Sequence, residues 1–263
     1  MEIKFTANLH SHTVRCNHAN GTEREYIERA LSGGLTTFGF SDHAPYAFPD
    51  GYYSGFRMLR EVQKDYIDTL IGLKEEYSGR IDIKLGYEME YYPKYFCETT
   101  KMITQYPVDY VILGQHFTEN EIDGVYAGGA TDDEDRLAGY VDQVNEALDT
   151  GFFTYVAHPD NLNFTGDSTI YDKHYSRLIE HAKKLSVPLE INFLGIRESR
   201  HYPNDRFFSL CGEIGAPVCI GCDAHTPFDA YDPVSFGKAK EMIGKYGLKY
   251  VESPSLKKPR EIG

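Results

Sequence analysis

The sequence predicts an α/β protein in which parallel strands close into a barrel. Short apolar runs, mostly rich in β-branched or aromatic residues, alternate along the chain with longer segments of helical pattern. This alternation favours a parallel sheet with right-handed crossovers. Seven such units in a continuous chain of 263 residues, without a low-complexity linker, favour a closed barrel and a single domain over residues 1–263. An open, doubly wound sheet is the alternative that the pattern leaves.

The expected strands are short and are bounded by Gly, Pro, Asp or Ser. They cover residues 3–9, 36–40, 81–87, 108–113, 153–157, 187–191 and 217–220. The expected helices lie near residues 23–32, 58–77, 94–105, 133–149, 170–185, 204–214 and 234–245. Thr22 and Glu25 have the spacing of a capping box at the start of the first helix. In the second, apolar residues recur at close to 3.6 residues, which supports a helix.

Composition and charge exclude several classes of protein. With 41% hydrophobic and 25% charged residues, the chain is typical of a folded globular protein. It contains no run near the roughly 20 apolar residues of a membrane span, and its first five residues do not resemble a signal peptide. The net charge of −13, without a basic tract, disfavours long nucleic acid as a partner but not a small phosphate ester at a local positive site.

The five cysteines predict a reducing compartment. They are odd in number and irregularly spaced, unlike a secreted disulfide framework. Cys219 and Cys222 have the spacing of half a zinc site or of a redox pair, but no second pair accompanies them. We therefore expect reduced cysteines in a cytoplasmic protein without a membrane partner.

Potential metal ligands follow six of the seven expected strands. They are His10 and His12 after the first strand, His43 after the second, Glu88 at the end of the third, His116 after the fourth, His158 after the fifth, and Asp223 and His225 after the seventh. The carboxyl ends of parallel barrel strands converge on one face, so these side chains are expected to meet there. Divalent metals require neutral imidazole nitrogen and carboxylate oxygen converging in space, and no structural need explains such residues after six strands. The sequence therefore predicts a metal centre, without fixing the number of metals.

The order of these motifs resembles that of the polymerase-and-histidinol-phosphatase (PHP) family of metal-dependent phosphoesterases. The order is His-x-His, a further His eight residues after the first, Asp-His, Gly-x-Glu, an isolated His, His-Pro and Asp-x-His, from His10 to His225. The resemblance implies a distorted (β/α)7 barrel of the PHP type, with three divalent metal ions at the C-terminal ends of the strands. Such imidazole-rich sites suit zinc, manganese, iron or cobalt.

The resemblance also implies a set of ligands. The first metal would be held by His10, His12, Glu88 and Asp223. Glu88 would bridge to a second metal, completed by His116 and His158. The third metal would be held by His18, His43 and His225. Glu90, two residues beyond Glu88 on the same strand face, is the rival for the bridging role. The remaining histidines, His174, His181 and His201, are expected at the surface.

Within the family, three segments are similar to those of members that hydrolyse L-histidinol phosphate in histidine biosynthesis. They are Gly86-Tyr87-Glu88 with Tyr91-Tyr92-Pro93, Gly114-Gln115-His116-Phe117, and Leu189-Glu190-Ile191-Asn192 leading to Gly195-Ile196-Arg197. The resemblance thus implies a phosphoric monoester hydrolase in which a metal-bridging hydroxide attacks the phosphorus in line. Two alternatives are a family member acting on nucleotide or phosphotyrosine substrates, and a non-catalytic metal-binding module.

Two further residues are candidates for catalysis. Arg197, after the sixth expected strand, is expected to clamp the phosphate, because its planar guanidinium matches phosphate oxygens. Asp42 adjoins His43 and either protonates the leaving oxygen or orients a metal ligand. The sequence does not separate these two roles, and a purely structural Asp at a strand end is a third possibility.

The organic part of a substrate has weaker candidates. A tyrosine-rich segment offers cation–π contacts to a cationic head group through Tyr87, Tyr91, Tyr92 and Tyr95. Glu119 and Asp160 are candidates to pair with an amine. Most tyrosines in a chain with 21 of them pack in the core, so this segment is a hypothesis only.

Overall fold

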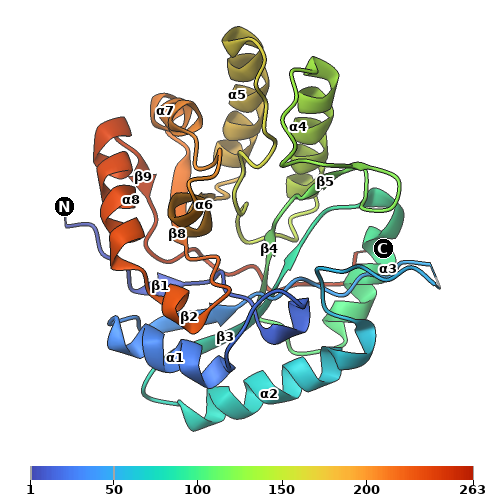
Figure 1. Ribbon diagram of the computed structural model, residues 1–263, viewed down its shortest axis with the longest axis vertical. Coiled ribbons are helices and arrows are strands. Elements are labelled where there is room, and N and C mark those ends of the chain that lie inside the picture. The colour runs from blue at the N-terminus through green and yellow to red at the C-terminus, as the bar shows by residue number, and fades with distance from the viewer. Residues whose placement is uncertain (1, 50, 263) are drawn as a thin grey trace.

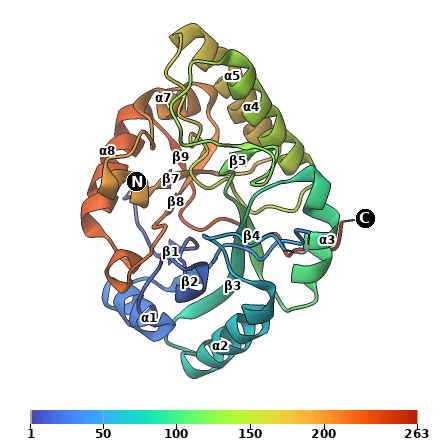
Figure 2. The same ribbon diagram turned by 45° about the vertical axis from the view of Figure 1, so that its right-hand side comes forward.

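Helices surround a central set of strands in the computed structural model (Figures 1 and 2), which describes residues 2–49 and 51–262. The helices are α1 (Glu23–Ser32), α2 (Gln63–Glu76), α3 (Pro93–Thr104), α4 (Glu134–Asp149), α5 (Ser168–Lys184), α6 (Phe193–Glu198), α7 (Asp205–Ile214) and α8 (Pro233–Tyr246). The strands are β1 (Ala7–Asn8), β2 (Thr37–Phe40), β3 (Asp82–Met89), β4 (Tyr110–Leu113), β5 (Phe117–Thr118), β6 (Val125–Tyr126), β7 (Leu189–Asn192), β8 (Pro217–Gly221) and β9 (Lys249–Tyr250). Short 3-10 helices are η1 (Val14–Cys16), η2 (Arg60–Val62) and η3 (Pro227–Ala230).

The parallel strands form two sheets that join into an irregular barrel. One sheet has the order β1-β2-β3-β4 and the other β7-β8-β9. Val156 connects them, because it makes parallel bridges to Leu113 of β4 and to Leu189 of β7. On the opposite side, a parallel bridge joins Ser11, beyond β1, to Ala224, beyond β8. The predicted barrel is confirmed. It is distorted at the two places where only single bridges connect the strands.

Most expected elements are present, and the differences are short elements. All expected helices form, and α1 has the predicted bounds. The predicted capping box is also confirmed, since Thr22 accepts from the Glu25 N–H and the Thr22 N–H donates to the Glu25 carboxylate at 2.7 Å. The expected strand 3–9 is reduced to the two residues of β1, and the expected strand 153–157 to the bridges of Val156. The hairpin β5–β6, helix α6 and strand β9 were not predicted, because elements of two to six residues carry too little periodicity.

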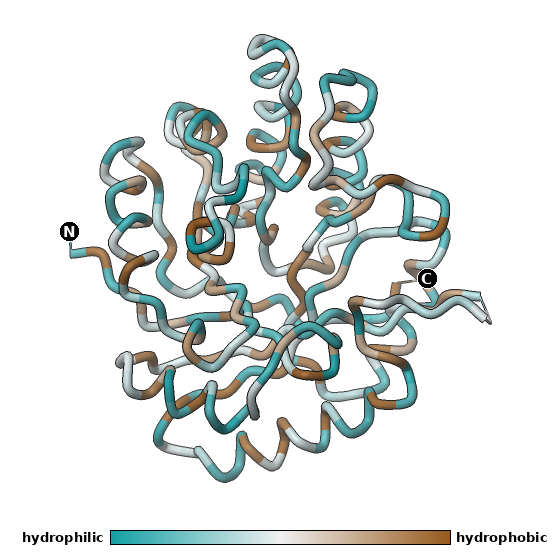
Figure 3. The backbone as a smooth tube through the Cα atoms, in the orientation of Figure 1, coloured by the Kyte–Doolittle hydropathy of each residue, from teal (hydrophilic) through white to brown (hydrophobic). Residues whose placement is uncertain are grey.

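The strands separate two apolar clusters, because successive side chains point to opposite faces. Val111 and Leu113 of β4 belong to the large cluster that also includes helix residues. Tyr110 and Ile112 alternate with them and belong to a small cluster inside the barrel. Figure 3 shows the hydrophobic and hydrophilic residues mixed along the outer helices, as amphipathic helices require. No helix in the described ranges is long and apolar enough to cross a membrane. A single domain over residues 1–263 stays a prediction.

Tyr110 packs inside the barrel, where two neighbouring glycines leave room for its side chain. Its hydroxyl donates to the Leu9 carbonyl at 2.7 Å. A Cβ atom on Gly39 would lie 2.2 Å from the Tyr110 hydroxyl oxygen, and one on Gly86 would lie 2.4 Å from its ring. Neighbouring strands β2 and β3 therefore leave the space that the phenol ring occupies.

Substitution of Gly86 tests this packing. We expect Gly86→Ala to lower the free energy of unfolding by about 1–3 kcal/mol, because the buried Tyr110 ring must move. Gly72 on the exposed side of α2 is the matched control, since no atom lies within 4 Å of its added Cβ. Gly72→Ala should raise the free energy of unfolding by about 0.5–1 kcal/mol. Urea unfolding measures both, and equal effects of the two substitutions would contradict the packing.

Candidate metal centre

Glu88, at the end of β3, lies at the centre of the predicted ligands. Its Oε2 is close to three imidazole nitrogens: 3.6 Å from His10 Nε2, 3.5 Å from His12 Nε2 and 3.1 Å from His43 Nδ1. Its Oε1 is close to two others: 2.8 Å from His158 Nε2 and 3.7 Å from His116 Nε2. The two oxygens thus face different groups of histidines, as a bridging carboxylate requires. This geometry favours Glu88 over Glu90 for the bridging role.

Asp223, just beyond β8, brings the last predicted carboxylate to the same cluster. Its Oδ1 lies 3.6 Å from His10 Nε2, 3.2 Å from His12 Nε2 and 3.4 Å from His225 Nδ1. Asp223 has a φ of 47°, and His158 has a φ of 30°. Such strained backbone in residues other than glycine clusters at functional sites. The fold therefore holds both residues in conformations that they would not adopt without a strong local constraint.

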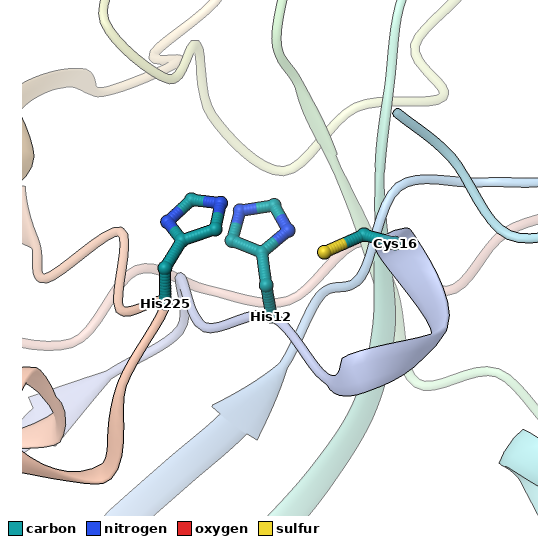
Figure 4. A group of neighbouring side chains, drawn as sticks. All are labelled: His12, Cys16 and His225. Atoms are coloured by element: carbon teal, nitrogen blue, oxygen red, sulfur yellow. The ribbon is translucent and has the colours of Figure 1, made fainter. Parts of the chain in front are cut away.

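The histidines assigned to the third metal also lie together. Ligand atoms of His18, His43 and His225 are all within 4.8 Å of one another. Between His18 and His225 the two Nε2 atoms are 3.0 Å apart. Figure 4 shows the His12 ring between His225 and Cys16, and the rings of His12 and His225 stack with centroids 4.1 Å apart. Cys16 of η1 is a neighbour that the sequence did not single out; its carbonyl oxygen lies 2.8 Å from His18 Nδ1.

The cluster has the properties of a site for divalent metals. Several buried imidazole nitrogens have no hydrogen-bond partner, namely His10 Nε2, both nitrogens of His12, His43 Nδ1 and His158 Nδ1. In the described part of the chain, seven acidic residues are buried, but Arg57 is the sole buried Arg or Lys. Buried anions need a compensating charge, and orphaned imidazole nitrogens need a ligand. Divalent cations would satisfy both, so the residues present fit the predicted metals.

Carboxylates behind the cluster orient two of its histidines. His10 Nδ1 lies 2.8 Å from Glu190 Oε1, and His116 Nδ1 lies 2.9 Å from Glu90 Oε1. Each contact turns the Nε2 of the ring towards Glu88, which is the usual support of a histidine ligand. Glu190 belongs to one of the sequence motifs, but its role in orienting His10 was not predicted. An acidic residue inside the buried run 187–191 was the available signal, because such strands are normally apolar.

Of the roles left open for Asp42, the geometry favours orientation of a ligand. Asp42 is buried and does not line the cavity that opens beside the cluster, which is described below. Its carboxylate accepts from the Thr13 N–H, from the Thr13 hydroxyl and from the His43 N–H. Asp42 Oδ1 also lies 3.6 Å from His12 Nδ1. Asp42 therefore approaches the cluster from behind His12, on the side away from the cavity.

Arg197 lies at the cavity but is already engaged by the protein. Its guanidinium donates to the Cys222 carbonyl at 2.9 Å and to the Asp223 carbonyl at 3.0 Å. The Nε atom lies 3.3 Å from Asp229 Oδ1. These contacts brace the loop that carries Asp223. The phosphate-clamp role of Arg197 stays a prediction, to which the structure adds a second role in positioning this loop.

A cavity of about 740 Å³ opens beside the cluster. Its wall includes Phe56, Phe117, Tyr126, Leu194 and Tyr202, and its acidic residues besides Glu88 and Asp223 are Glu198 and Asp229. This volume lies within the range of small-molecule sites, about 300–1,000 Å³. The aromatic wall comes from the β5–β6 hairpin and from loops that the sequence did not define.

The candidates for a head-group pocket were wrong. Tyr87, Tyr92 and Tyr95 are buried in the apolar core and none of them, nor Tyr91, lines the cavity. Asp160 is buried away from the cavity lining, and Glu119 is absent from that lining. Tyr87 belongs to β3 and its ring packs against Tyr66 of α2, whereas the Tyr92 ring packs against Tyr46.

The surface prediction for the three remaining histidines was also wrong for His174. His174 is buried between α4 and α5, where its Nε2 lies 3.0 Å from Glu134 Oε1. His181 is half-buried and pairs with Asp149, and His201 is half-buried with its Nε2 2.8 Å from the Asn161 carbonyl. His174 and His181 belong to α5, and both of their acidic partners belong to the neighbouring α4, whereas His201 lies in the segment between α6 and α7.

Comparison with known proteins identifies the family. The PHP domain matches residues 8–193, which is more than half of the chain and includes most of the cluster. The chain belongs to the PHP family. The resemblance seen in the order of the sequence motifs is therefore confirmed.

Relatives of this PHP protein include curated histidinol-phosphatases. A probable histidinol-phosphatase of Deinococcus radiodurans is 28% identical over 238 residues, which cover 83% of this chain and 85% of the relative. The histidinol-phosphatase of Bacillus subtilis is 34% identical over 118 residues, covering 43% of this chain and 44% of the relative.

A solved structure shares the fold of this PHP protein. The histidinol phosphate phosphatase of Lactococcus lactis, in complex with zinc, L-histidinol and phosphate, superposes with a TM-score of 0.73. The two sequences are 19% identical, and the match covers 95% of this chain and 98% of the other. The likeness confirms the barrel architecture.

Substitution of Glu88 tests the bridging assignment. Glu88→Gln retains the volume of the side chain but removes the negative charge that both groups of histidines face. We expect the variant to lose two equivalents of bound metal together. Glu98→Gln, on the exposed side of α3, is the control and should keep the full content. Metal content after dialysis, measured by elemental analysis, decides the outcome, and full content in Glu88→Gln would contradict the assignment.

Metal binding is expected to release protons below about pH 9. Burial lowers the pKa of His12, but the nearby carboxylates of Asp223, Asp42 and Glu88 outweigh it and raise this pKa to about 9. A metal binds neutral imidazole, so it must displace this proton at any lower pH, and its affinity should fall as the pH falls. Zinc titration of the metal-free protein in two buffers of different ionisation enthalpy measures the release, and identical heats would contradict it.

Proposed function

We propose that this protein is a metal-dependent phosphatase that hydrolyses L-histidinol phosphate to L-histidinol and phosphate, in histidine biosynthesis in the cytoplasm. The observation that carries the proposal is the complete cluster of His, Glu and Asp side chains beside a cavity of about 740 Å³. Membership of the PHP family and the names of the relatives support this choice of substrate. The described cysteines, all free of disulfides, agree with a reducing compartment.

The proposed cofactors are three divalent metal ions, with zinc, manganese and iron as the candidates. We assign the first to His10, His12, Glu88 and Asp223, the second to Glu88, His116 and His158, and the third to His18, His43 and His225. When bound, such ions neutralise phosphoryl oxygens and make water a nucleophile at neutral pH. A phosphomonoester dianion repels nucleophiles and has a poor leaving group, so this help is what the reaction needs.

The chain itself contributes rigidity and a shaped, partly apolar cavity. Most of the cluster is buried, and Glu190, Glu90 and Asp42 hold its rings from behind. Ligands held in this way need no rearrangement as charge develops on the phosphoryl group, which is the main electrostatic advantage of an enzyme site. Phe56, Phe117 and Tyr126 give the cavity an aromatic wall.

The cavity lining contains acidic side chains as well as the arginines Arg197 and Arg200. Glu198 and Asp229 line the cavity and carry negative charge towards it. Asp229 is partly neutralised by Arg197, whereas the partner of Glu198 is Arg200, whose side chain is 38% exposed. An amino alcohol phosphate presents a cation at the end away from its phosphate, and these acidic side chains are the candidates to pair with it. A nucleoside monophosphate lacks such a cation.

A substrate panel tests the proposal. We expect kcat/KM for L-histidinol phosphate to exceed the values for p-nitrophenyl phosphate, a nucleoside monophosphate, a 3′,5′-bisphosphate nucleotide and a phosphotyrosine peptide by roughly a thousandfold. This factor corresponds to about 4 kcal/mol of differential transition-state binding. Faster hydrolysis of a nucleotide or of the phosphotyrosine peptide by the metal-loaded enzyme would move the protein to another substrate class. Loss and recovery of the rate on metal removal and return would exclude a non-catalytic metal-binding module.

A further inference from the structure

Arg57 is a buried cation next to the metal centre. It lies in the loop between β2 and α2, and its side chain is 2% exposed. Its Nη1 donates to the Ala44 carbonyl at 3.1 Å. Its Nη2 donates to Glu90 Oε1 at 3.1 Å, and its Nε donates to Glu121 Oε2 at 3.0 Å. One guanidinium therefore connects the β2–α2 loop, the end of β3 and the β5–β6 hairpin.

Aromatic rings enclose the guanidinium and keep water from it. The Arg57 Cζ atom lies 4.5 Å from the ring centroid of Phe56, 5.0 Å from that of Tyr46 and 5.8 Å from that of Phe48. Ion pairs in such surroundings are weakly screened, and removal of one partner leaves an uncompensated charge. The contact between Arg57 and Glu90 is therefore a strong constraint on the position of Glu90.

Glu90, held in place by Arg57, in turn fixes the orientation of His116. The same Oε1 that accepts from Arg57 lies 2.9 Å from His116 Nδ1. With Nδ1 held by Glu90, the opposite nitrogen, Nε2, faces Glu88 Oε1 at 3.7 Å. A continuous row of contacts thus runs from Glu121 through Arg57 and Glu90 to His116.

Without its contact to Arg57, Glu90 could act as a metal ligand itself. Its Oε2 is buried without a hydrogen-bond partner. A carboxylate oxygen of Glu90 and nitrogens of His43 and His116 lie within 4.8 Å of one another, so a released Glu90 could reach a metal itself. Glu190, which supports His10, has no such arginine and is held by Asn192 and the His158 N–H. The arginine is thus specific to the His116 side of the centre.

We propose that Arg57 and Glu90 are positioning residues for His116, and that Arg57 keeps Glu90 behind this histidine and out of the metal coordination. The inference rests on the proposed metal centre. It predicts that one metal, the one assigned to His116 and His158, depends on a residue that touches no metal ligand. The other two metals should be indifferent to Arg57.

The experiment compares substitutions in one loop of the full-length protein. Arg57→Gln removes the cation, and Arg57→Lys restores charge without the planar fork. Arg60→Gln is the matched control, because Arg60 holds the same loop through the Tyr46 and Phe48 carbonyls but contacts no carboxylate of the centre. Glu90→Gln is the second variant, isosteric with glutamate, which tests the same row of contacts if Arg57→Gln does not fold.

Zinc affinity by chelator competition and the visible spectrum of the cobalt-substituted protein are the two readouts. We expect Arg57→Gln and Glu90→Gln to weaken one metal by about 10–100-fold and to change the cobalt spectrum, with partial recovery in Arg57→Lys and no change in Arg60→Gln. Equal weakening of all metals, or the same loss in Arg60→Gln, would overturn the proposal in favour of a loop-packing role. Unchanged affinity and spectrum would also overturn it, whereas failure of the unsubstituted protein to bind zinc would instead refute the proposed metal centre.

Discussion

Burial of negative charge at the strand ends is the constraint on which the rest of the structure depends. Glu88, Glu90, Glu190, Asp42 and Asp223 are all nearly inaccessible to water and lie around one group of imidazoles. A buried carboxylate is stable only when it is paired or coordinates a cation. The histidines and Arg57, the single buried arginine of the described residues, supply part of the compensation, and divalent metals would supply the rest. Folding and metal binding are therefore expected to be coupled in this protein.

The barrel makes this concentration of charge possible by leaving space for the carboxylates. A Cβ atom on Gly114 would lie 1.9 Å from Glu88 Oε1, and one on Gly221 would lie 1.7 Å from Glu190 Oε1. Both glycines are at the carboxyl ends of strands, where a side chain of any size would push the acid out of place. The strand ends thus provide two things at once, the ligands and the room in which they converge.

The sequence predicted the features that are repeated or ordered along the chain. Long helices and the order of strand-end ligands such as His10, Glu88 and Asp223 follow from periodicity and spacing, and the structure brings those residues together. The support of these ligands was harder to predict. Arg57 lies 33 residues before Glu90, in a loop whose sequence shows no periodicity. Its contact with Glu90 depends on the fold, which residue spacing alone does not predict. The prediction for the tyrosines of segment 87–95 failed for the same reason, because the direction of each ring depends on what it packs against in the fold.

The parts that the sequence left undefined are also those that select a substrate. A cluster of metals held by histidines and carboxylates neutralises any phosphomonoester, so it offers little discrimination between leaving groups. Discrimination must come from the walls of the cavity, where Phe117 and Tyr126 belong to the β5–β6 hairpin and Glu198 belongs to α6. These short elements lie on loops of a rigid scaffold, where specificity usually resides. The strand-end motifs therefore predict the type of reaction, whereas the choice of phosphate ester depends on the three-dimensional arrangement of the loops.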